Sequence, residues 1–394
     1  MSQVDRSQVT PIDWDAIRSE FPVTENYLYF DLANKCPLPV FSTQAIEAYI
    51  ASQQKSGGDK EQWFATVNSA RSRFADMINC SIDDVAFTKN TSEGLNIAAN
   101  CLPLEAGDTV VLNEHEHPNN VYCWLNLKSK GVNVHWIPAP DGFVTPQTLE
   151  EHAPKSMKVL AVSSVTYAPG NRNDIHDLAR YCRERGVYLV VDGVQSVGTM
   201  NVDIDYMGAD ILCGSGHKAL MCPHGVGLLY IRPEIRDRMH PLYVARAGME
   251  MAAQIEYGEI SYALEIPQAA KKFEIGNYNY LGLTVLDCAL KRLNEIGMSN
   301  IEARLLSLNE LLSQGLTAAG FELASPRDTS LGSAIVCFRT GNARSLHEYL
   351  VRHNAITTVR RDMIRVSLGF YNSSDDIDGF LALLHSWQTT ESEG

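Results

Sequence analysis

Short apolar segments that alternate with segments of helical periodicity constrain the fold of this 394-residue chain more than any other feature of its sequence. The apolar segments are rich in Val, Ile, Leu and Phe and have the length of buried strands. Strands that alternate with helices form a mostly parallel sheet with helices on both faces. We therefore expect an α/β fold. The expected strands cover residues 85–88, 109–112, 132–136, 159–163, 187–191, 210–213 and 226–231, and the helices between them include segments from Ser92, from about Asn119 and over 174–185.

The chain on either side of this series has a different pattern of expected helices and strands. The expected elements there are residues 12–20, 40–78, 286–319 and 344–354 as helices and residues 27–31, 333–338 and 363–367 as strands. The α+β pattern after about residue 285 predicts a smaller C-terminal domain. We divide the chain into an N-terminal segment (1–26) that packs with the small domain, a large domain (27–284) that holds the ligand site, and the small domain (285–394).

Composition excludes several classes of protein. The formal net charge of −14, with no basic stripe, argues against a nucleic-acid partner. No run of apolar residues is long enough for a membrane span, and residues 1–8 lack the apolar stretch of a signal peptide. The nine cysteines are scattered without C-x-x-C pairs, which fits reduced thiols better than disulfides or a zinc site. We expect a cytoplasmic protein without a membrane partner.

Two motifs point to a specific chemistry. The apolar strand 187–191 ends at Asp192, and Ser215-Gly-His-Lys218 follows the next expected strand. The carboxyl ends of strands are where open α/β sheets hold their ligands. A lysine that forms an imine, with an acid that keeps a pyridine nitrogen protonated, is what pyridoxal 5′-phosphate requires from a protein. Each residue also fits an ordinary role, Lys218 as a surface lysine and Asp192 as a helix N-cap.

Further polar residues fit the same ligand. Thr91 and Ser92 open a helix, where they form either an anion site or a plain N-cap. Gln195 is placed to reach the ring hydroxyl of the cofactor, while Ser215 and His217 are placed to donate to its phosphate.

His117 lies in a polar segment, residues 114–120, that follows an expected strand. Two histidines there suggest metal ligands, but no matching His/Cys cluster occurs elsewhere, so we expect no metal. The remaining possibilities are a ring that stacks on a planar cofactor and an ordinary surface histidine.

Taken together, these motifs resemble class V of the fold type I pyridoxal-phosphate enzymes, in the cysteine desulfurase and isopenicillin-N-epimerase-like branch. The likeness runs from about Tyr29 to the end of the chain. Its landmarks, in family order, are Asn90-Thr-Ser-Glu-Gly94, Glu116-His117, Val191-Asp192-Gly-Val-Gln195, Ser215-Gly-His-Lys218, Phe273-Glu-x-Gly276 and Arg365-Val-Ser-Leu-Gly-Phe-Tyr-Asn372.

The resemblance implies a transferase-like fold with a mostly parallel seven-stranded sheet between helices and a smaller α+β C-terminal domain. It implies an L-amino-acid substrate and a homodimer with active sites at the subunit interface. It also implies residue roles. The catalytic residues would be Lys218, Asp192 and His117; the cofactor-binding residues would be these three with Thr91, Ser92, Gln195, Ser215, His217 and Asn277; and the substrate-binding residues would be Arg365 and Asn34.

Two departures from the family qualify this picture. Desulfurases carry their persulfide cysteine on a mobile loop shortly before the arginine that corresponds to Arg365. Here that segment, residues 353–364, is short and contains no cysteine, and the last cysteine of the chain is Cys337. Asn277 replaces a threonine that in many relatives reaches the neighbouring subunit's phosphate. Arg360 and Arg361 are a further oddity, either a solvated charge pair or a second anion site for an acidic substrate side chain.

Three reactions remain open. β-Elimination needs only Lys218 and a leaving group, and transamination uses the same lysine to deliver the Cα proton to the cofactor. Epimerisation needs a proton donor on the opposite face of the ring, and none is identified. A stacking histidine is typical of the lyase and desulfurase branch, whereas the aminotransferase branch places a tryptophan there. We expect a C–S or related β-elimination lyase, with an aminotransferase as the alternative and an epimerase or a non-catalytic cofactor-binding protein less favoured.

Overall fold

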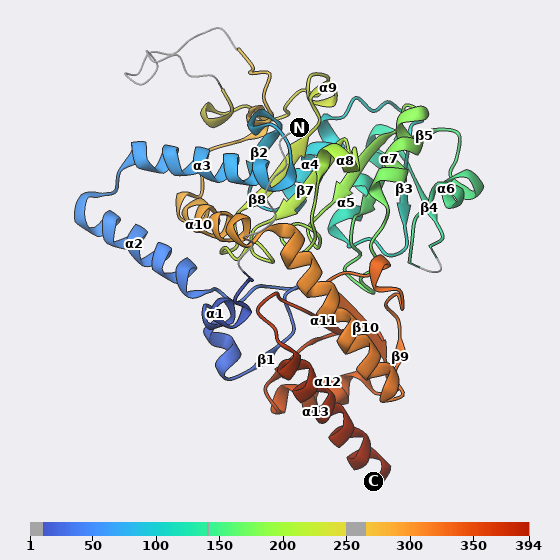
Figure 1. Ribbon diagram of the computed structural model, residues 1–394. Coiled ribbons are helices and arrows are strands. Elements are labelled where there is room, and N and C mark those ends of the chain that lie inside the picture. The colour runs from blue at the N-terminus through green and yellow to red at the C-terminus, as the bar shows by residue number, and fades with distance from the viewer. Residues whose placement is uncertain (1–10, 140–141, 250–264, 394) are drawn as a thin grey trace, which may run out of the picture.

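The computed structural model describes residues 11–139, 142–249 and 265–393 (Figure 1). A seven-stranded sheet in the order β2-β8-β7-β6-β5-β3-β4 forms its centre. The neighbouring strands β7, β6, β5, β3 and β4 are parallel, and β8 runs antiparallel to both β7 and β2. The predicted mostly parallel α/β sheet is therefore confirmed. Its strands are β2 (Val85–Thr88), β3 (Thr109–Asn113), β4 (Asn133–Ile137), β5 (Met157–Ser163), β6 (Tyr188–Asp192), β7 (Ile211–Ser215) and β8 (Gly227–Ile231).

Alternate residues of each central strand pack into two separate apolar layers. In β6, Leu189 and Val191 join one layer while Tyr188 and Val190 join the other. Both faces of the sheet are thus covered by helices, as a buried parallel sheet requires. The first layer includes residues of α3 (Lys60–Ile78), α6 (Pro146–His152), α7 (Ile175–Glu184), α8 (Ile204–Met207) and α10 (Tyr280–Ile296), and the second includes residues of α4 (Thr91–Cys101), α5 (Asn119–Leu125) and α9 (Pro233–Arg236).

A smaller antiparallel sheet, in the order β12-β13-β10-β9, lies below the large sheet in Figure 1 with the last helices of the chain. Its strands are β9 (Glu322–Leu323), β10 (Ile335–Arg339), β12 (Thr358–Arg360) and β13 (Met363–Ser367), and the helices are α11 (Met298–Ala318), α12 (Ala343–Arg352) and α13 (Ser374–Glu393). The predicted smaller α+β part is therefore present. The expected domain border at residue 285 falls inside α10, which packs against α3, so the three-part division of the chain stays a proposal.

The start of the described chain packs against its end. β1 (Leu28–Tyr29) pairs in parallel with β11 (Ala355–Ile356), and α1 (Trp14–Ser19) places Arg18 against Asp376 at 2.7 Å. Residues 1–10 of the expected N-terminal segment lie outside the described residues. The pairing of β1 with β11 brings residues 30–36 to the edge of the large sheet, where the candidate site forms.

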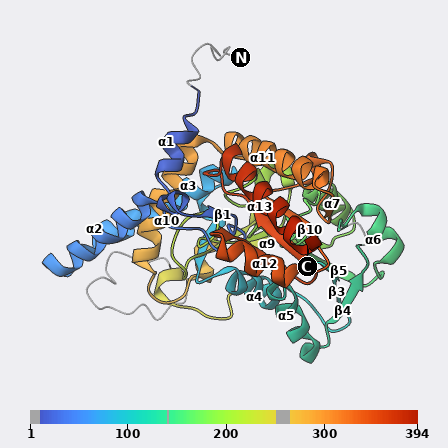
Figure 2. The same cartoon turned by 90° about the horizontal axis from the view of Figure 1, so that it is seen from below.

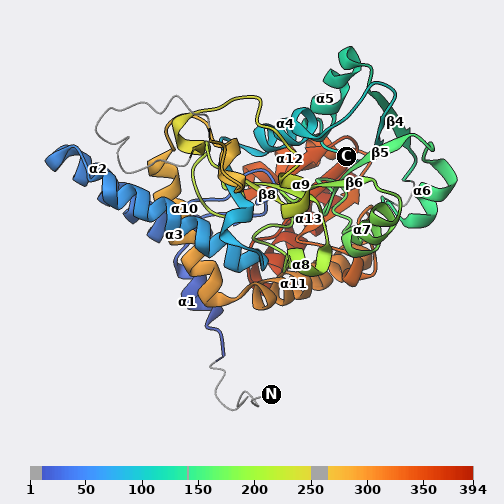
Figure 3. The ribbon, with the colours of Figure 1, turned by 90° about the horizontal axis from the view of Figure 1, so that it is seen from above.

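The expected helical stretch 40–78 is two helices, α2 (Val40–Ser56) and α3. Gly57 and Gly58 separate them with φ of 78° and 87°, and Asp59 caps α3. A Cβ on Gly58 would lie 2.0 Å from the Trp63 ring, so both the backbone conformation and the packing require glycine there. Figures 2 and 3 show α2 projecting from one side of the molecule.

The remaining short elements are 3-10 turns that connect these helices and strands. They are η1 (Pro22–Glu25), η2 (Ile82–Asp84), η3 (Asn126–Lys130), η4 (Arg246–Gly248), η6 (Ala270–Phe273) and η7 (Thr329–Leu331). In the described part of the chain, no helix combines the length and the apolar character needed to cross a membrane.

Candidate active site

A cavity of about 210 Å³ lies at the carboxyl ends of β5, β6 and β7, beside the first turn of α4. All the predicted site residues except Arg365 and Asn277 line it. The lining residues among them are Asn34, Thr91, Ser92, His117, Asp192, Gln195, Ser215, His217 and Lys218.

Strand pairing explains why these residues meet. Asp192 is the last residue of β6, where it pairs with Ser163 of β5 on one side and Cys213 of β7 on the other. β7 continues to Ser215, and the chain then turns so that Lys218 reaches the same edge. Carboxyl ends of parallel strands meet at one edge of a sheet, so residues far apart in the sequence converge there.

Asp192 and Lys218 form an electrostatically linked pair. Burial is the main cause that raises the pKa of Asp192 to about 6; Glu116 acts in the same direction, and the Val194 amide and Lys218 oppose the shift. Burial also lowers the pKa of Lys218 to about 8, with Arg365 and Arg360 acting in the same direction against Asp192. This lowered pKa makes the neutral amine, which both a nucleophile and a general base require, more accessible near physiological pH than in an ordinary lysine.

The first turn of α4 presents its positive end to the cavity. The side chain of Asn90 caps the helix by accepting a hydrogen bond from the Glu93 amide at 3.0 Å, so Thr91 and Ser92 are not needed as caps. A Cβ on Gly227 of β8 would lie 2.6 Å from the carbonyl carbon of Asn90, and glycine there lets the helix begin against the sheet. A helix start with two hydroxyls at a cavity suits an anion.

Ser215 and His217 are joined to each other. The Ser215 Oγ lies 2.6 Å from the His217 Nδ1, and the His217 ring stacks on His224 with centroids 4.2 Å apart. Burial lowers the pKa of His217 to about 4, with His224 and Lys218 adding to the shift, so its imidazole is neutral at pH 7. The Gln195 side-chain nitrogen donates to the Ala33 carbonyl at 3.0 Å, which ties the segment after β1 to the cavity.

His117 lies on the cavity wall, edge-on to Tyr167 at 5.2 Å between ring centroids. Its Nδ1 accepts a hydrogen bond from the Asn119 amide at 3.2 Å, and burial lowers its pKa. The structure therefore places His117 at the ligand cavity and excludes the ordinary surface histidine. Within the described ranges, no group of three or more His, Cys, Asp or Glu side chains is arranged to hold a metal ion.

Glu116 holds this wall in place. Its buried carboxylate accepts hydrogen bonds from the side chains of Asn113 and Asn120, at 2.6 and 2.7 Å, and from the amide and hydroxyl of Ser163, at 2.9 and 2.7 Å. The carboxylate thus connects the ends of β3 and β5 to α5. The sequence marked Glu116 only as a landmark, although an acid three residues after a buried strand was a signal for such a role.

Arg365 of β13 is almost completely buried, with 1% of its surface exposed, yet it lacks a full set of partners. Its Nη1 donates to the Tyr167 carbonyl at 3.0 Å, and its Nη2 lies 3.6 Å from the Asp31 carboxylate. Within the described residues, Nε and Nη2 have no hydrogen-bond partner. Asp362, the acid nearest to Arg365 in the sequence, pairs instead with Arg339 at 2.5 Å.

A buried guanidinium whose Nε and Nη2 make no hydrogen bond, beside a ligand cavity, fits a carboxylate that arrives with the substrate. Arg365 contributes to lowering the pKa of both Lys218 and His117, so its charge acts on the same space. Asn34 lines that cavity and donates to Asp31 at 2.9 Å.

Asn277 is the predicted site residue that the structure places elsewhere. It lines a separate cavity with Lys89, Glu93, Gly225 and Glu274, not the lysine cavity of its own chain. Its expected contact with a neighbouring subunit stays a prediction. In contrast, sequence reasoning missed Ser163, Val165 and Tyr167 in the cavity wall, because their segment carries no motif of its own. It also missed Asn119, although this residue lies in the polar segment 114–120.

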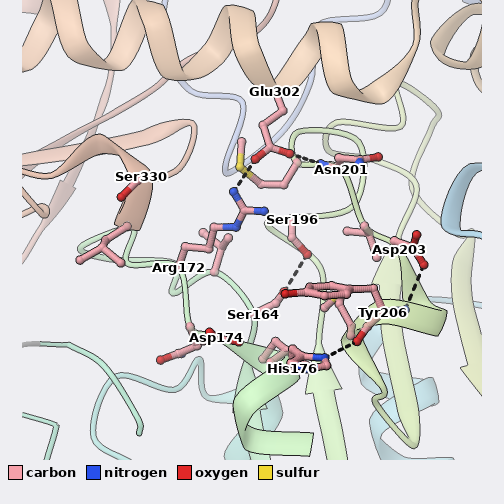
Figure 4. Close-up of a pocket in the computed structure, with 17 residues that line it drawn as sticks. Ser164, Arg172, Asp174, His176, Ser196, Asn201, Asp203, Tyr206, Glu302 and Ser330 are labelled. Atoms are coloured by element: carbon pink, nitrogen blue, oxygen red, sulfur yellow. Dashed lines mark hydrogen bonds and ion pairs between the residues drawn. The ribbon is translucent and has the colours of Figure 1, made fainter.

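Another cavity, of about 580 Å³, lies beyond the ends of β5 and β6 and shares Val165 with the lysine cavity (Figure 4). Its polar groups are already paired with one another. Arg172 forms an ion pair with Glu302, Ser164 bonds to Ser196 at 2.7 Å, and the His176 Nδ1 lies 2.6 Å from the Tyr206 carbonyl. Satisfied groups of this kind hold the wall together, so the lysine cavity is the better candidate site.

Comparisons with known proteins agree with this geometry. The sequence model of the family described as aminotransferase class-V matches residues 29–380. A probable cysteine desulfurase of Pyrococcus abyssi is 30% identical over 93% of this chain and 96% of its own length. An uncharacterised aminotransferase of Schizosaccharomyces pombe is 28% identical over 92% and 93%. The solved apo cysteine desulfurase of Thermococcus onnurineus NA1 superposes with a TM-score of 0.87 at 24% identity, over 96% of this chain and 99% of that one, which confirms the expected fold.

Proposed function

The chain belongs to the aminotransferase class-V family of pyridoxal-phosphate enzymes, and within it we propose a lyase that performs β-elimination on an L-amino acid without a persulfide cysteine. The bond cleaved would be a C–S or related bond between Cβ and the leaving group.

A short hairpin carries this proposal. β12 and β13 are antiparallel with Arg360 opposite Met363, so only Arg361 and Asp362 form the turn, and Arg361 has φ of 56°. The family resemblance implies that this segment corresponds to the mobile loop on which desulfurases carry a nucleophilic cysteine. A two-residue turn has neither the reach nor the thiol for persulfide formation.

The cysteines of this chain support the same conclusion. No thiol is among the groups that line the lysine cavity in the described structure. Cys337, opposite Arg365 in β10, is fully buried, and burial raises its pKa to about 12. At pH 7 roughly one such thiol in 10⁵ is ionised, and only the thiolate attacks sulfur.

The residues of the cavity fit pyridoxal phosphate and an amino acid. Lys218 would hold the cofactor covalently, Asp192 its ring nitrogen, Gln195 its ring hydroxyl, and His117 its ring face. Its phosphate would lie among the hydroxyls of Thr91, Ser92 and Ser215 and the ring of His217. When bound, the cofactor supplies an electron sink that stabilises negative charge at the substrate Cα. The unpartnered Nε and Nη2 of Arg365 are the observation that supports an amino acid as substrate.

Lys218 would then act as the base. Its neutral amine, favoured by the lowered pKa, would accept the Cα proton, and the leaving group would depart from Cβ with the bonding electrons. The aminotransferase alternative is kept because the same amine can return the proton at a different atom, and because a relative of similar identity is named an aminotransferase.

The proposal includes a homodimer with the active site at its interface. The separate position of Asn277, with exposed apolar side chains at Leu242, Tyr243 and Ile275, supports a second subunit against this side. The nine cysteines are all free, which supports a reducing compartment such as the cytoplasm.

The deciding experiment incubates the cofactor-loaded protein with a panel of L-amino acids, including S-alkyl cysteines, cystine and alanine. We expect stoichiometric pyruvate and ammonia from substrates with a β-leaving group, and no protein persulfide. Conversion to the pyridoxamine form, with one oxo acid formed per site and no ammonia, would instead establish the aminotransferase. Lys218→Ala serves as the inactive control.

A further inference from the structure

A further cavity, of about 570 Å³ and called the second cavity below, opens beside the lysine cavity and shares Tyr167 with it. It is enclosed by residues 114–115, 142–143, 167–169, 322–326 and 360–363. Tyr167 is held at the boundary because its carbonyl accepts the 3.0 Å hydrogen bond from Arg365. An amino acid bound at Arg365 would therefore have open space past Tyr167 for a long side chain.

Arg360 differs from Arg339, another cation of this second cavity. Arg339 is neutralised by Asp362 at 2.5 Å and Glu322 at 3.4 Å. Arg360 is half-buried, and its one hydrogen bond goes to the adjacent Val359 carbonyl at 3.0 Å. Among the described residues, no carboxylate forms an ion pair with Arg360. A partly buried guanidinium in this condition gains most from an anionic ligand.

Strand register places Arg360 on the same side of the small sheet as Arg365. Thr358 lies directly opposite Arg365 across the β12–β13 pair, and Arg360 is two residues further along β12. Directly opposed residues, and residues two apart in a strand, share a face of the sheet. Both side chains therefore lie on one face of the small sheet, and Arg360 lines the second cavity.

The charges of the site show the same proximity. Arg360 contributes to lowering the pKa of Lys218, His117 and Arg365. Asp31 lies close to Arg365 and also accepts hydrogen bonds from Asn34 and Thr358, so its negative charge is not paired with Arg360. A ligand with a single carboxylate at Arg365 would leave that excess positive charge in place, whereas a ligand with two anionic groups would neutralise both arginines.

We propose that Arg360 binds an anionic group at the far end of the substrate side chain, which extends past Tyr167 into the second cavity. The substrate class is then an L-amino acid whose β-linked leaving group ends in a carboxylate or a comparable anion. The nature of the leaving group rests on the proposed β-elimination, while the anion site rests on the geometry alone.

A binding experiment tests the site independently of turnover. L-2-Aminopimelate is the all-carbon counterpart of a cysteine thioether with a terminal carboxylate, and it has no β-leaving group. Calorimetry would compare it with its neutral ω-amide on the cofactor-loaded enzyme. We expect the wild type to bind the diacid at least tenfold more tightly, and Arg360→Met to reduce this ratio to near one. Arg360→Lys, which keeps the charge without the planar donor pair, should give an intermediate ratio.

Arg352→Met is the matched control, because Arg352 is equally charged, exposed at the end of α12 and not among the residues that line either cavity. It should keep the wild-type ratio. A wild-type ratio near one, an unchanged ratio in Arg360→Met, or an equal loss in both variants would each overturn the assignment of Arg360.

Turnover of S-(2-carboxyethyl)-L-cysteine and its ω-amide separates this inference from the proposed function. Elimination breaks the Cα–H and Cβ–S bonds, the thiol leaves with the electron pair and takes up a proton, and water releases pyruvate and ammonia. An Arg360-dependent binding ratio without any pyruvate would refute the elimination and keep the anion site. Equal pyruvate from both compounds with a binding ratio near one would do the reverse.

Discussion

Replacing Arg365 with methionine should separate substrate binding from stability. In the structure Arg365 is buried but has one hydrogen bond, to the Tyr167 carbonyl, and a 3.6 Å approach to Asp31. Asp31 keeps its contacts with Asn34 and Thr358 when the guanidinium is removed. The cost of burying the charge of Arg365 is thus only partly offset in the protein without substrate.

The expected magnitudes follow from these contacts. Two charge-assisted hydrogen bonds from Nε and Nη2 to a carboxylate are worth roughly 1.5–3 kcal/mol each. Their loss should weaken amino-acid binding at least about 100-fold, at about 1.4 kcal/mol for each factor of ten. A methionine of similar length fills the buried site, so the free energy of unfolding should stay within about 1 kcal/mol of the wild type.

Arg71 provides the matched comparison. It is also buried, but it forms a two-bond ion pair with Glu274 at 2.6 and 3.2 Å and donates to the Val85 carbonyl. Arg71→Met breaks this buried ion pair on one side and leaves Glu274 only its hydrogen bonds from the Phe87 amide and the Tyr278 hydroxyl, which should cost about 3–5 kcal/mol. The assay is urea unfolding of both variants, with calorimetric titration of an amino acid and of its decarboxylated amine into Arg365→Met. A loss of stability in Arg365→Met as large as in Arg71→Met, or equal weakening of the acid and the amine, would refute the carboxylate role.

The other predictions concern the centre of the site. Lys218→Ala should give no detectable product and no near-visible absorbance of covalently held cofactor, and undiminished turnover would contradict its role. Asp192→Ala should lower turnover at least about 100-fold, whereas a change below about tenfold would mean that another residue serves the ring nitrogen. Cys337→Ala should leave turnover within about threefold, and a persulfide trapped on any cysteine would count against the lyase. Burial lowers the pKa of Lys218 to about 8, and only the neutral amine attacks the cofactor aldehyde. Covalent uptake of pyridoxal phosphate by the apo-protein should therefore rise about tenfold per pH unit below pH 8 and level off above it. A flat profile from pH 6 to 9 would argue against the lowered pKa.

The sequence alone was sufficient for the strands of the large sheet and for most of the residues that line the cavity, but not for the order of the strands in the sheet or for the short strands β9, β11 and β12. Asp192 and Lys218 could be identified because each follows an apolar strand, and parallel strands bring their carboxyl ends to one edge. The start of α4 at Thr91 could be predicted for a similar reason, since capping chemistry is local to a few residues. The break between α2 and α3 also has a local cause, Gly57 and Gly58. The sequence analysis predicted a single helical stretch there because apolar residues recur at helical spacing on both sides of the two glycines.

Tertiary structure alone decided which charges are satisfied. Whether Arg365 pairs with Asp362 or remains open to a ligand depends on where Arg339 and Asp31 lie, and these come from other strands and from the opposite end of the chain. The position of Arg360 on the face of Arg365 follows from the register of a two-residue hairpin. Motifs record which residues follow one another along a strand or helix. The partners of a buried charge are set by packing between segments hundreds of residues apart, because only the folded arrangement fixes the distances on which electrostatic and hydrogen-bond energies depend.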